Sequence, residues 1–272
     1  MQDTGAAKGG SMRGMNDKSR EGAGSQGGFW TIILAAGKGK RMNSDLAKVL
    51  HPVCGVPMLA HSVAAARAAG ARKIVVVIGH QGERIRELFS RDELIFVEQT
   101  DLLGTGHAVL QTREVFRGYT GTVVILCGDV PLILPETVRG LYDRHRSTGA
   151  VVTVLTTIPA EPAGYGRVVK AKDGSVLRIV EDRDATPEEK QIREINTGIY
   201  CVESPFLFDA VGRLGNTNAQ REYYLTDIVE MACRNGLRVM SSLAPDPVEV
   251  MGINTSIELE KACQRMKEWG RR

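Results

Sequence analysis

Basic and glycine residues gather directly after the first apolar run of the chain. Residues 34–42 read Leu-Ala-Ala-Gly-Lys-Gly-Lys-Arg-Met, and Lys48 follows six residues later. Glycine lets backbone N–H groups approach a phosphate closely, while Lys38, Arg41 and Lys48 supply positive charge. The segment is not a Walker A motif, and Met42 stands where the third glycine of GxGxxG belongs. By spacing alone it fits a phosphate loop or an ordinary strand-to-helix turn.

Two oxygen-bearing side chains further along could hold a divalent cation. Asp129 follows the apolar run 123–126, and Asn254 precedes a helical pattern that begins near Ser256. Carboxylate and amide oxygens suit a hard cation such as magnesium. By residue type alone, the commoner roles are a turn aspartate before Pro131 and a helix N-cap.

Two further polar residues invite a role in binding. Gln99 carries one acceptor and two donors, a set that suits the edge of a pyrimidine base. Without other information it is a polar residue after a strand. His107 falls in the first turn of a predicted helix with no carboxylate or nucleophile evident nearby, so we interpret it as structural.

These residues need elements that bring them together, and from Phe29 the chain alternates strand and helix patterns. The predicted strands are 31–36, 73–78, 94–97, 122–126 and 151–157, and the predicted helices between them are 57–69, 83–89, 105–116 and 135–147. Apolar strands that alternate with helices predict an α/β fold, a mostly parallel sheet with helices on both faces. Ligands of such sheets bind at the carboxyl ends of the strands.

The pattern changes after about residue 160. A hairpin is predicted over 166–171 and 175–181, then a strand over 193–202. Helical patterns at 226–234 and 256–269 follow, with a strand near 237–243 between them. We expect these elements to complete one α/β domain, with part of them forming a second lobe.

Composition limits the class of protein. Of 272 residues, 43% are apolar and 25% charged, and 35 basic against 32 acidic side chains give a net charge of +3. This balance does not favour nucleic acid or membrane as the main partner. Residues 1–28 hold eight glycines and no Val, Ile, Leu or aromatic residue, so we expect a flexible tail there and one domain over 29–272.

The cysteines bear on the cellular compartment. Five scattered cysteines without a CxxC pair, and the absence of a secretory segment, predict reduced thiols and a cytoplasmic protein. They are Cys54, Cys127, Cys201, Cys233 and Cys263.

Taken in order, the motifs resemble those of the sugar-1-phosphate nucleotidyltransferases. After the glycine segment and Lys48 come Gln99 and the segments 103–108 (LGTGHA), 128–132 (GDVPL), 164–167 (GYGR), Glu181, 194–198 (EINTG), 218–227 (NAQREYYLTD) and 252–254 (GIN). Over residues 30–269 the chain is similar to the uridyltransferase (pyrophosphorylase) domain of the bacterial bifunctional N-acetylglucosamine-1-phosphate uridyltransferases and glucosamine-1-phosphate acetyltransferases. The resemblance implies a Rossmann-like nucleotide-diphospho-sugar transferase fold with a mostly parallel mixed sheet.

The resemblance also implies roles for single residues. Arg41, Lys48 and Asp129 would be catalytic, and Asp129 with Asn254 would bind Mg²⁺. Gln99 with Gly104 and Thr105 would recognise uracil, while Gly166, Glu181 and Asn196 would line the sugar pocket. The full substrate-binding set is Leu34, Ala35, Ala36, Gly37, Lys38, Lys48, Gln99, Gly104, Thr105, Gly128, Gly166, Glu181, Asn196 and Asn254.

The function implied is the synthesis of UDP-N-acetylglucosamine from UTP and N-acetylglucosamine 1-phosphate, for peptidoglycan and lipopolysaccharide biosynthesis. One alternative is another sugar-1-phosphate uridylyl- or thymidylyltransferase. Another is a non-catalytic nucleotide-binding subunit, because a fold does not fix a function. A homo-oligomer is possible but not predicted.

The chain departs from the family in two ways. Lys40, Cys127 and Arg221 stand where threonine, tyrosine and glycine are common. The chain also ends at Arg272 with no hexapeptide periodicity, so acetyl transfer is not expected. A stand-alone enzyme and a piece of a longer protein both fit.

Overall fold

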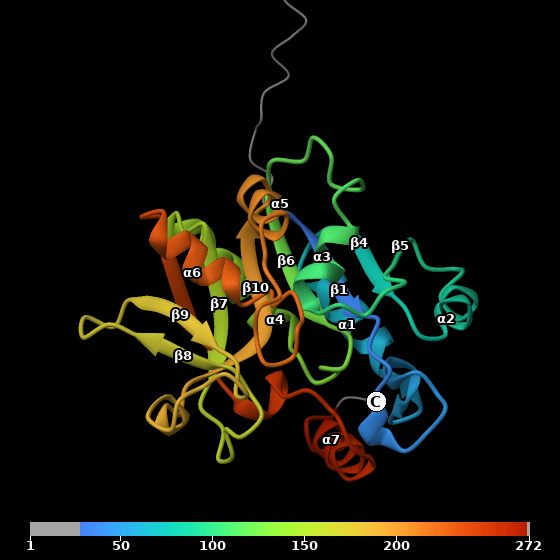
Figure 1. Cartoon of the computed structure of the whole chain (residues 1–272). Coiled ribbons are helices and arrows are strands. Elements are labelled where there is room, and N and C mark those ends of the chain that lie inside the picture. Colours follow the sequence, from blue (N-terminus) through green and yellow to red (C-terminus); the bar gives the residue numbers. More distant parts are fainter. Residues whose placement is uncertain (1–27, 271–272) are drawn as a thin grey trace, which may run out of the picture.

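The chain folds around one mixed sheet of nine strands, which runs through the middle of the molecule (Figure 1). This computed structural model describes residues 28–270, so nearly all of the expected tail, residues 1–27, lies outside the described part. The strand order is β11-β7-β10-β6-β1-β4-β5, and β8 and β9 branch from β10. The strands are β1 (Phe29–Ala35), β4 (Ala71–Ile78), β5 (Ile95–Glu98), β6 (Thr122–Cys127), β7 (Val152–Thr157), β8 (Arg167–Lys170), β9 (Val176–Val180), β10 (Ile195–Glu203) and β11 (Val239–Leu243).

The expected mostly parallel mixed sheet is confirmed. Strands β1, β4, β5 and β6 pair in parallel, as do β7 and β11. Strand β10 runs antiparallel to β6, β7 and β8, and the predicted hairpin forms as β8 and β9. This hairpin projects at the opposite side of the molecule from α2 (Gly82–Leu88) (Figure 1).

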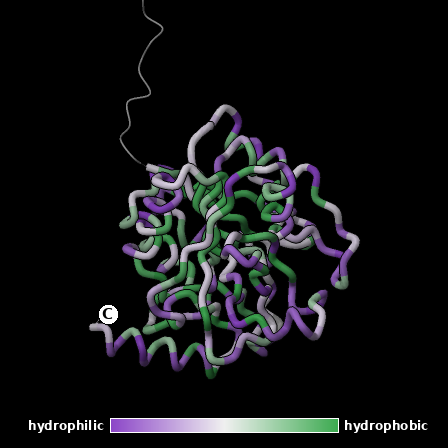
Figure 2. The backbone as a smooth tube through the Cα atoms, turned by 90° about the vertical axis from the view of Figure 1, so that its left-hand side faces the viewer, coloured by the Kyte–Doolittle hydropathy of each residue, from purple (hydrophilic) through white to green (hydrophobic). Residues whose placement is uncertain are grey.

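Apolar side chains on both faces of the strands explain why helices cover both faces. In β1, Ile33 packs into a cluster with α1 (Met58–Ala68), α2 and α4 (Pro135–Thr148), whereas Ile32 packs with α3 (Thr105–Gln111), α5 (Ser204–Val211) and α6 (Asp227–Arg234). Alternate residues of a strand face opposite sides of the sheet, so each face has its own core. The hydropathy-coloured tube shows the apolar segments gathered in the interior (Figure 2).

Two parts of the fold were not predicted. Helix α5 was not predicted, although Pro205 lies in its first turn, where helices tolerate proline. The short hairpin of β2 (Pro52–Val53) and β3 (Val56–Pro57) gives no periodic signal. The predicted helix at 105–116 is regular only to Gln111. No helix within residues 28–270 has the length and apolar character needed to cross a lipid bilayer.

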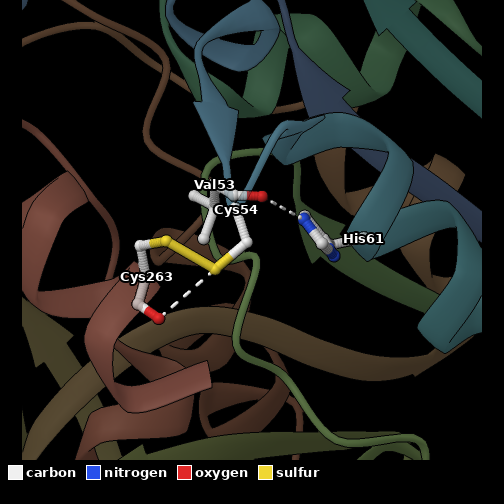
Figure 3. The surroundings of a disulfide bond; sticks show 4 residues. All are labelled: Val53, Cys54, His61 and Cys263. Atoms are coloured by element: carbon white, nitrogen blue, oxygen red, sulfur yellow. Dashed lines mark hydrogen bonds between the residues drawn. A yellow bond between two sulfur atoms is a disulfide. The ribbon is translucent and has the colours of Figure 1, made fainter. Parts of the chain in front are cut away.

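A third, smaller cluster holds the C-terminal helix α7 (Ser256–Glu268) against the β2–β3 hairpin. This packing brings Cys54 and Cys263 together with their Cα atoms 5.2 Å apart, and they form a disulfide (Figure 3). His61 of α1 donates from Nε2 to the carbonyl of Val53 at 3.1 Å, which fastens the hairpin to α1.

The expectation that all five cysteines are reduced is therefore wrong for Cys54 and Cys263. They lie 209 residues apart, so sequence spacing gives no sign of the pairing. Cys127, Cys201 and Cys233 are free thiols, as expected.

Candidate active site

A cavity lies at the carboxyl ends of β1 and β6, as expected for an α/β sheet. These strands are parallel neighbours, so the segment after β1 and Asp129 after β6 meet at one edge. The cavity has a volume of about 420 Å³. Its lining is Leu34, Ala35, Ala36, Gly37, Gly39, Arg41, Lys48, Val49, Gln99, Leu102, Gly104, Thr105, Ala108, Cys127, Asp129, Glu222 and Asn254.

At one end of the cavity, a lysine joins the two predicted metal ligands. Lys48 donates from Nζ to the carboxylate of Asp129 and, at 2.7 Å, to Oδ1 of Asn254. Arg41 donates from Nη2 to the same Asn254 oxygen, also at 2.7 Å. Four residues from distant parts of the sequence thus form one cluster of charged and polar groups: Arg41, Lys48, Asp129 and Asn254.

The arrangement fits a magnesium ion. The oxygens of Asp129 and Asn254 converge on one cation, the Lys48 ammonium, and Mg²⁺ prefers such oxygen ligands together with water and substrate phosphates. No group of three or more His, Cys, Asp or Glu side chains placed to hold a metal occurs within residues 28–270. Asp129 and Asn254 are thus the two side chains of this cluster whose oxygens could hold a magnesium ion.

Glycine at position 39 permits the close approach of the loop to Lys48. Gly39 has φ 66°, and a Cβ there would lie 2.6 Å from the Lys48 Cβ. Both the left-handed backbone and the lack of space exclude larger residues. One short 3-10 helix, Lys40–Met42, begins directly after Gly39, and another, Lys48–Leu50, begins at Lys48.

The segment that carries Asn254 is held by hydrogen bonds to Asp129 on one side and to Glu258 of α7 on the other. Ile253 donates its N–H to the Asp129 carbonyl at 2.9 Å. Glu258 accepts from the N–H groups of Asn254 and Thr255, at 2.6 and 3.0 Å, in a capping box. Thr255, not Asn254, is the N-cap of α7, so the N-cap role considered for Asn254 is wrong. The Asn254 side chain is thereby free to face the cavity.

Ahead of this segment, a buried carboxylate holds the chain to α4. Glu249 is 1% exposed, and its Oε2 accepts from the Thr137 hydroxyl at 2.7 Å and from the Leu134 N–H at 3.4 Å. These donors belong to the first turn of α4 and its N-cap, where the helix dipole favours a negative charge. No sequence signal singled out Glu249.

The other end of the cavity carries the residues predicted to bind the base. Gln99 is 4% exposed and donates from Nε2 to the Gly104 carbonyl at 3.1 Å. Thr105 accepts from the Leu225 N–H at 3.1 Å. Gly104 has φ 109° and lies against the backbone of Tyr223, so a side chain there would clash. The cavity thus has a cationic end and an amide-lined end.

The three predicted sugar-pocket residues, Gly166, Glu181 and Asn196, lie close together but do not line the main cavity. Asn196 donates its N–H to the Gly166 carbonyl at 2.8 Å, and a Cβ on Gly166 would lie 3.5 Å from the Glu181 carboxylate. Glu181 accepts from the Thr226 hydroxyl at 3.2 Å, and burial raises the pKa of this carboxyl. It lines a neighbouring cavity of about 320 Å³.

Two other predicted residues also lie outside the main cavity. Lys38 lines an adjacent hollow together with Gln99. Gly128 donates its N–H to the Leu34 carbonyl at 2.9 Å, which ties β6 to β1.

Other lining residues had no predicted binding role. Cys127 lines the cavity and its thiol contacts the Gly198 carbonyl, while burial raises the thiol pKa well above its ordinary value. Glu222 also lines the cavity and belongs to the segment 218–227. Near it, Arg221 has φ 55° where the resembling family often has glycine, the residue that adopts this backbone most readily.

Comparison with known proteins identifies the family of the chain. Residues 31–189 match the MobA-like NTP transferase domain. The chain belongs to this family of nucleotidyltransferases.

Among curated proteins, the chain is a homologue of the bifunctional protein GlmU. It is 57% identical over 237 residues to that of Geobacter metallireducens, a match that covers 87% of this chain and 50% of the relative. With GlmU of Desulfotalea psychrophila it shares 47% identity, over 87% of this chain and 70% of the relative. The chain spans about half the length of most of the curated relatives it matches.

A solved structure of UDP-glucose pyrophosphorylase in complex with UDP-glucose has the same fold. The TM-score is 0.70 at 15% identity, and the match covers 89% of this chain and 99% of the other. At this identity the likeness concerns the fold alone.

Proposed function

We propose that this protein is an N-acetylglucosamine-1-phosphate uridyltransferase. The observation that carries the proposal is the cluster of Lys48, Asp129 and Asn254 beside a glycine loop, in a chain 57% identical to a GlmU protein. The product would be UDP-N-acetylglucosamine, which serves peptidoglycan and lipopolysaccharide synthesis. Residues 29–272 would form the nucleotidyltransferase domain.

The reaction needs little from the protein beyond position and charge. A phosphate oxygen of N-acetylglucosamine 1-phosphate attacks the α-phosphorus of UTP and forms a new P–O bond. The bond from the α-phosphorus to the bridging oxygen breaks, and pyrophosphate leaves with the electron pair. The attacking phosphate is ionised at neutral pH, so no general base is required.

The cationic end of the cavity supplies the charge. Arg41 and Lys38, with the N–H groups of the loop that follows β1, would neutralise the charge that grows on pyrophosphate. Lys48 would hold phosphates of one or both substrates. Asp129 and Asn254 would hold a magnesium ion, which supplies Lewis-acid polarisation of phosphate oxygens when bound.

The amide-lined end would take the base, and the group around Glu181 would take the sugar. Gln99, Gly104 and Thr105 offer the hydrogen-bonding groups for uracil. Glu181 and Asn196 pair a carboxylate with an amide, which together can bond sugar hydroxyls and an acetamido group.

Partners and location follow from this chemistry. The partners would be the two small substrates, with no nucleic acid and no membrane. We propose a cytoplasmic location on the basis of the substrate class alone. The Cys54–Cys263 disulfide does not support this location, because disulfides are uncommon in that compartment.

The test is pyrophosphate release from UTP, with and without N-acetylglucosamine 1-phosphate, in magnesium or in EDTA. Release is expected only when UTP, this sugar phosphate and magnesium are all present. Glucose 1-phosphate and dTTP are the controls for the alternative sugar and base. Release with glucose 1-phosphate but not with N-acetylglucosamine 1-phosphate would point to a different transferase. No release with any pair of nucleotide and sugar phosphate would point to a binding subunit.

A further inference from the structure

His107 contacts Gln99, the residue proposed to bind the base. It lies in the first turn of α3, half-buried, with its Nδ1 atom 3.1 Å from Nε2 of Gln99. On the other side of the imidazole, the side-chain amide of Gln111 lies 3.0 Å from Nε2. Both ring nitrogens therefore have a polar neighbour, and one of these neighbours lines the cavity.

The carbonyl of Gly104 decides which way the Gln99 amide points. A carbonyl oxygen can only accept, so the group 3.1 Å from it must be the NH₂ of Gln99. The second hydrogen of the same NH₂ then points to His107 Nδ1, which must accept. The imidazole proton is accordingly on Nε2. As placed, the Gln111 NH₂ also donates to the His107 carbonyl at 3.3 Å, so its amide oxygen reaches that proton by a half-turn about its last bond that gives up this longer hydrogen bond.

With both N–H groups engaged, only the oxygen of Gln99 remains for a ligand. Among residues 28–270 this oxygen accepts no hydrogen bond, although the side chain is 4% exposed and lines the cavity. Turning the amide over would place its oxygen against two acceptors, the Gly104 carbonyl and His107 Nδ1. Each of the two partners therefore opposes the flip.

We propose that His107 is a positioning residue that sets the base selectivity of the site, because it holds the Gln99 oxygen toward the bound base. An acceptor there suits a pyrimidine edge that carries N3–H, as in uracil or thymine. Cytosine presents a bare N3, itself an acceptor, and is rejected. This inference rests on the proposed function and deepens it.

The test compares binding of UTP and CTP by calorimetry, without sugar phosphate, so that the readout does not depend on turnover. The wild-type protein is expected to prefer UTP by at least about 100-fold. His107→Phe keeps a ring but removes the acceptor, and it should lower this preference by about tenfold. His107→Asn places an oxygen near the former Nδ1 and should keep the preference within about threefold of wild type.

Val109→Ala provides the matched control for destabilisation of α3. Val109 is fully buried in the same helix and is absent from the lining of the cavity, so its truncation should leave the UTP to CTP ratio unchanged. A ratio that stays unchanged in His107→Phe, or that falls equally in Val109→Ala, overturns the proposal. Equal binding of both nucleotides by the wild type also overturns it. Binding of neither nucleotide would overturn the proposed function itself.

Discussion

At the scale of single residues, the cationic end of the cavity holds charges that neutralise one another. Asp129 contacts Lys48, and its carbonyl also accepts from Ile253 of the Asn254 segment. In the proposed reaction, Asp129→Ala should lower kcat by about 100-fold or more, since it would remove an electrostatic group beside the reacting phosphates. Steady-state kinetics of pyrophosphate release checks this. Asp143→Ala, at an exposed aspartate of α4, should keep normal turnover, and near-normal turnover of Asp129→Ala would refute the assigned role.

Asp227 gives a prediction for stability against pH. Burial raises its pKa from 3.8 to about 6, and the nearby Glu230 and Asp184 carboxylates add to this. The folded state therefore holds the proton more tightly than the unfolded state. The stability that this proton gives is complete below about pH 4 and is lost as the pH rises through about 6.

The free energy of unfolding of Asp227→Asn, taken relative to wild type, should accordingly increase from pH 4 to pH 7. The expected increase is about 1 kcal/mol after allowance for solvent screening of a partly exposed group. Urea unfolding at both pH values measures the difference. Asp173→Asn is the control of opposite sign, because hydrogen bonds from Ser175 lower the pKa of Asp173. A difference for Asp227→Asn that does not change with pH contradicts the prediction.

At the scale of elements, the site depends on an anchor between the Pro247–Val250 3-10 helix and α4. Glu249→Ala removes the acceptor for Thr137 and the Leu134 N–H, and it should lower the free energy of unfolding by about 2 kcal/mol. The Asn254 segment follows directly, so the magnesium concentration for half-maximal activity should rise several-fold. Urea unfolding and a magnesium titration measure the two effects.

Two variants separate this anchor from general damage to α4. Glu249→Gln keeps an oxygen acceptor and should retain most of both properties. Glu136→Ala removes an exposed carboxylate from the same helical turn and should leave the magnesium dependence unchanged. If Glu249→Ala lost stability but kept its magnesium dependence, the anchor would have no bearing on the site.

At the scale of the whole molecule, the Cys54–Cys263 disulfide joins the β2–β3 hairpin near the start of the domain to α7 near its end (Figure 3). A crosslink over 209 residues lowers the entropy of the unfolded chain. In the chain-entropy model this stabilises the folded state by about 5 kcal/mol at most. Cys54→Ser should therefore lower the free energy of unfolding by about 2–4 kcal/mol. Dithiothreitol should have a similar effect on the wild-type protein.

Urea unfolding with and without dithiothreitol measures this effect. Cys233→Ser is the control, because Cys233 is a free thiol. Identical unfolding midpoints of the wild type in both conditions would mean that the disulfide does not form in solution.

Much of this protein could be predicted from its sequence. Continuous apolar runs such as those of β1 and β6, alternating with helical periodicity, determine an α/β fold, because buried parallel strands need apolar residues on both faces. The position of Asp129 at a strand end and of glycine and basic residues after β1 locates the site at one sheet edge. Local rules suffice for such features.

Tertiary structure decided the rest, because those features depend on residues distant in the chain. The approach of Lys48 to Asn254, the burial of Glu249 against α4 and the pairing of Cys54 with Cys263 all span more than 100 residues. His107 is an exception, because it lies only eight residues from Gln99, yet its residue type and spacing gave no signal that its Nδ1 would face the Gln99 amide. Sequence patterns record periodicity and local turn chemistry, whereas contacts between distant segments follow from how the helices pack on the sheet.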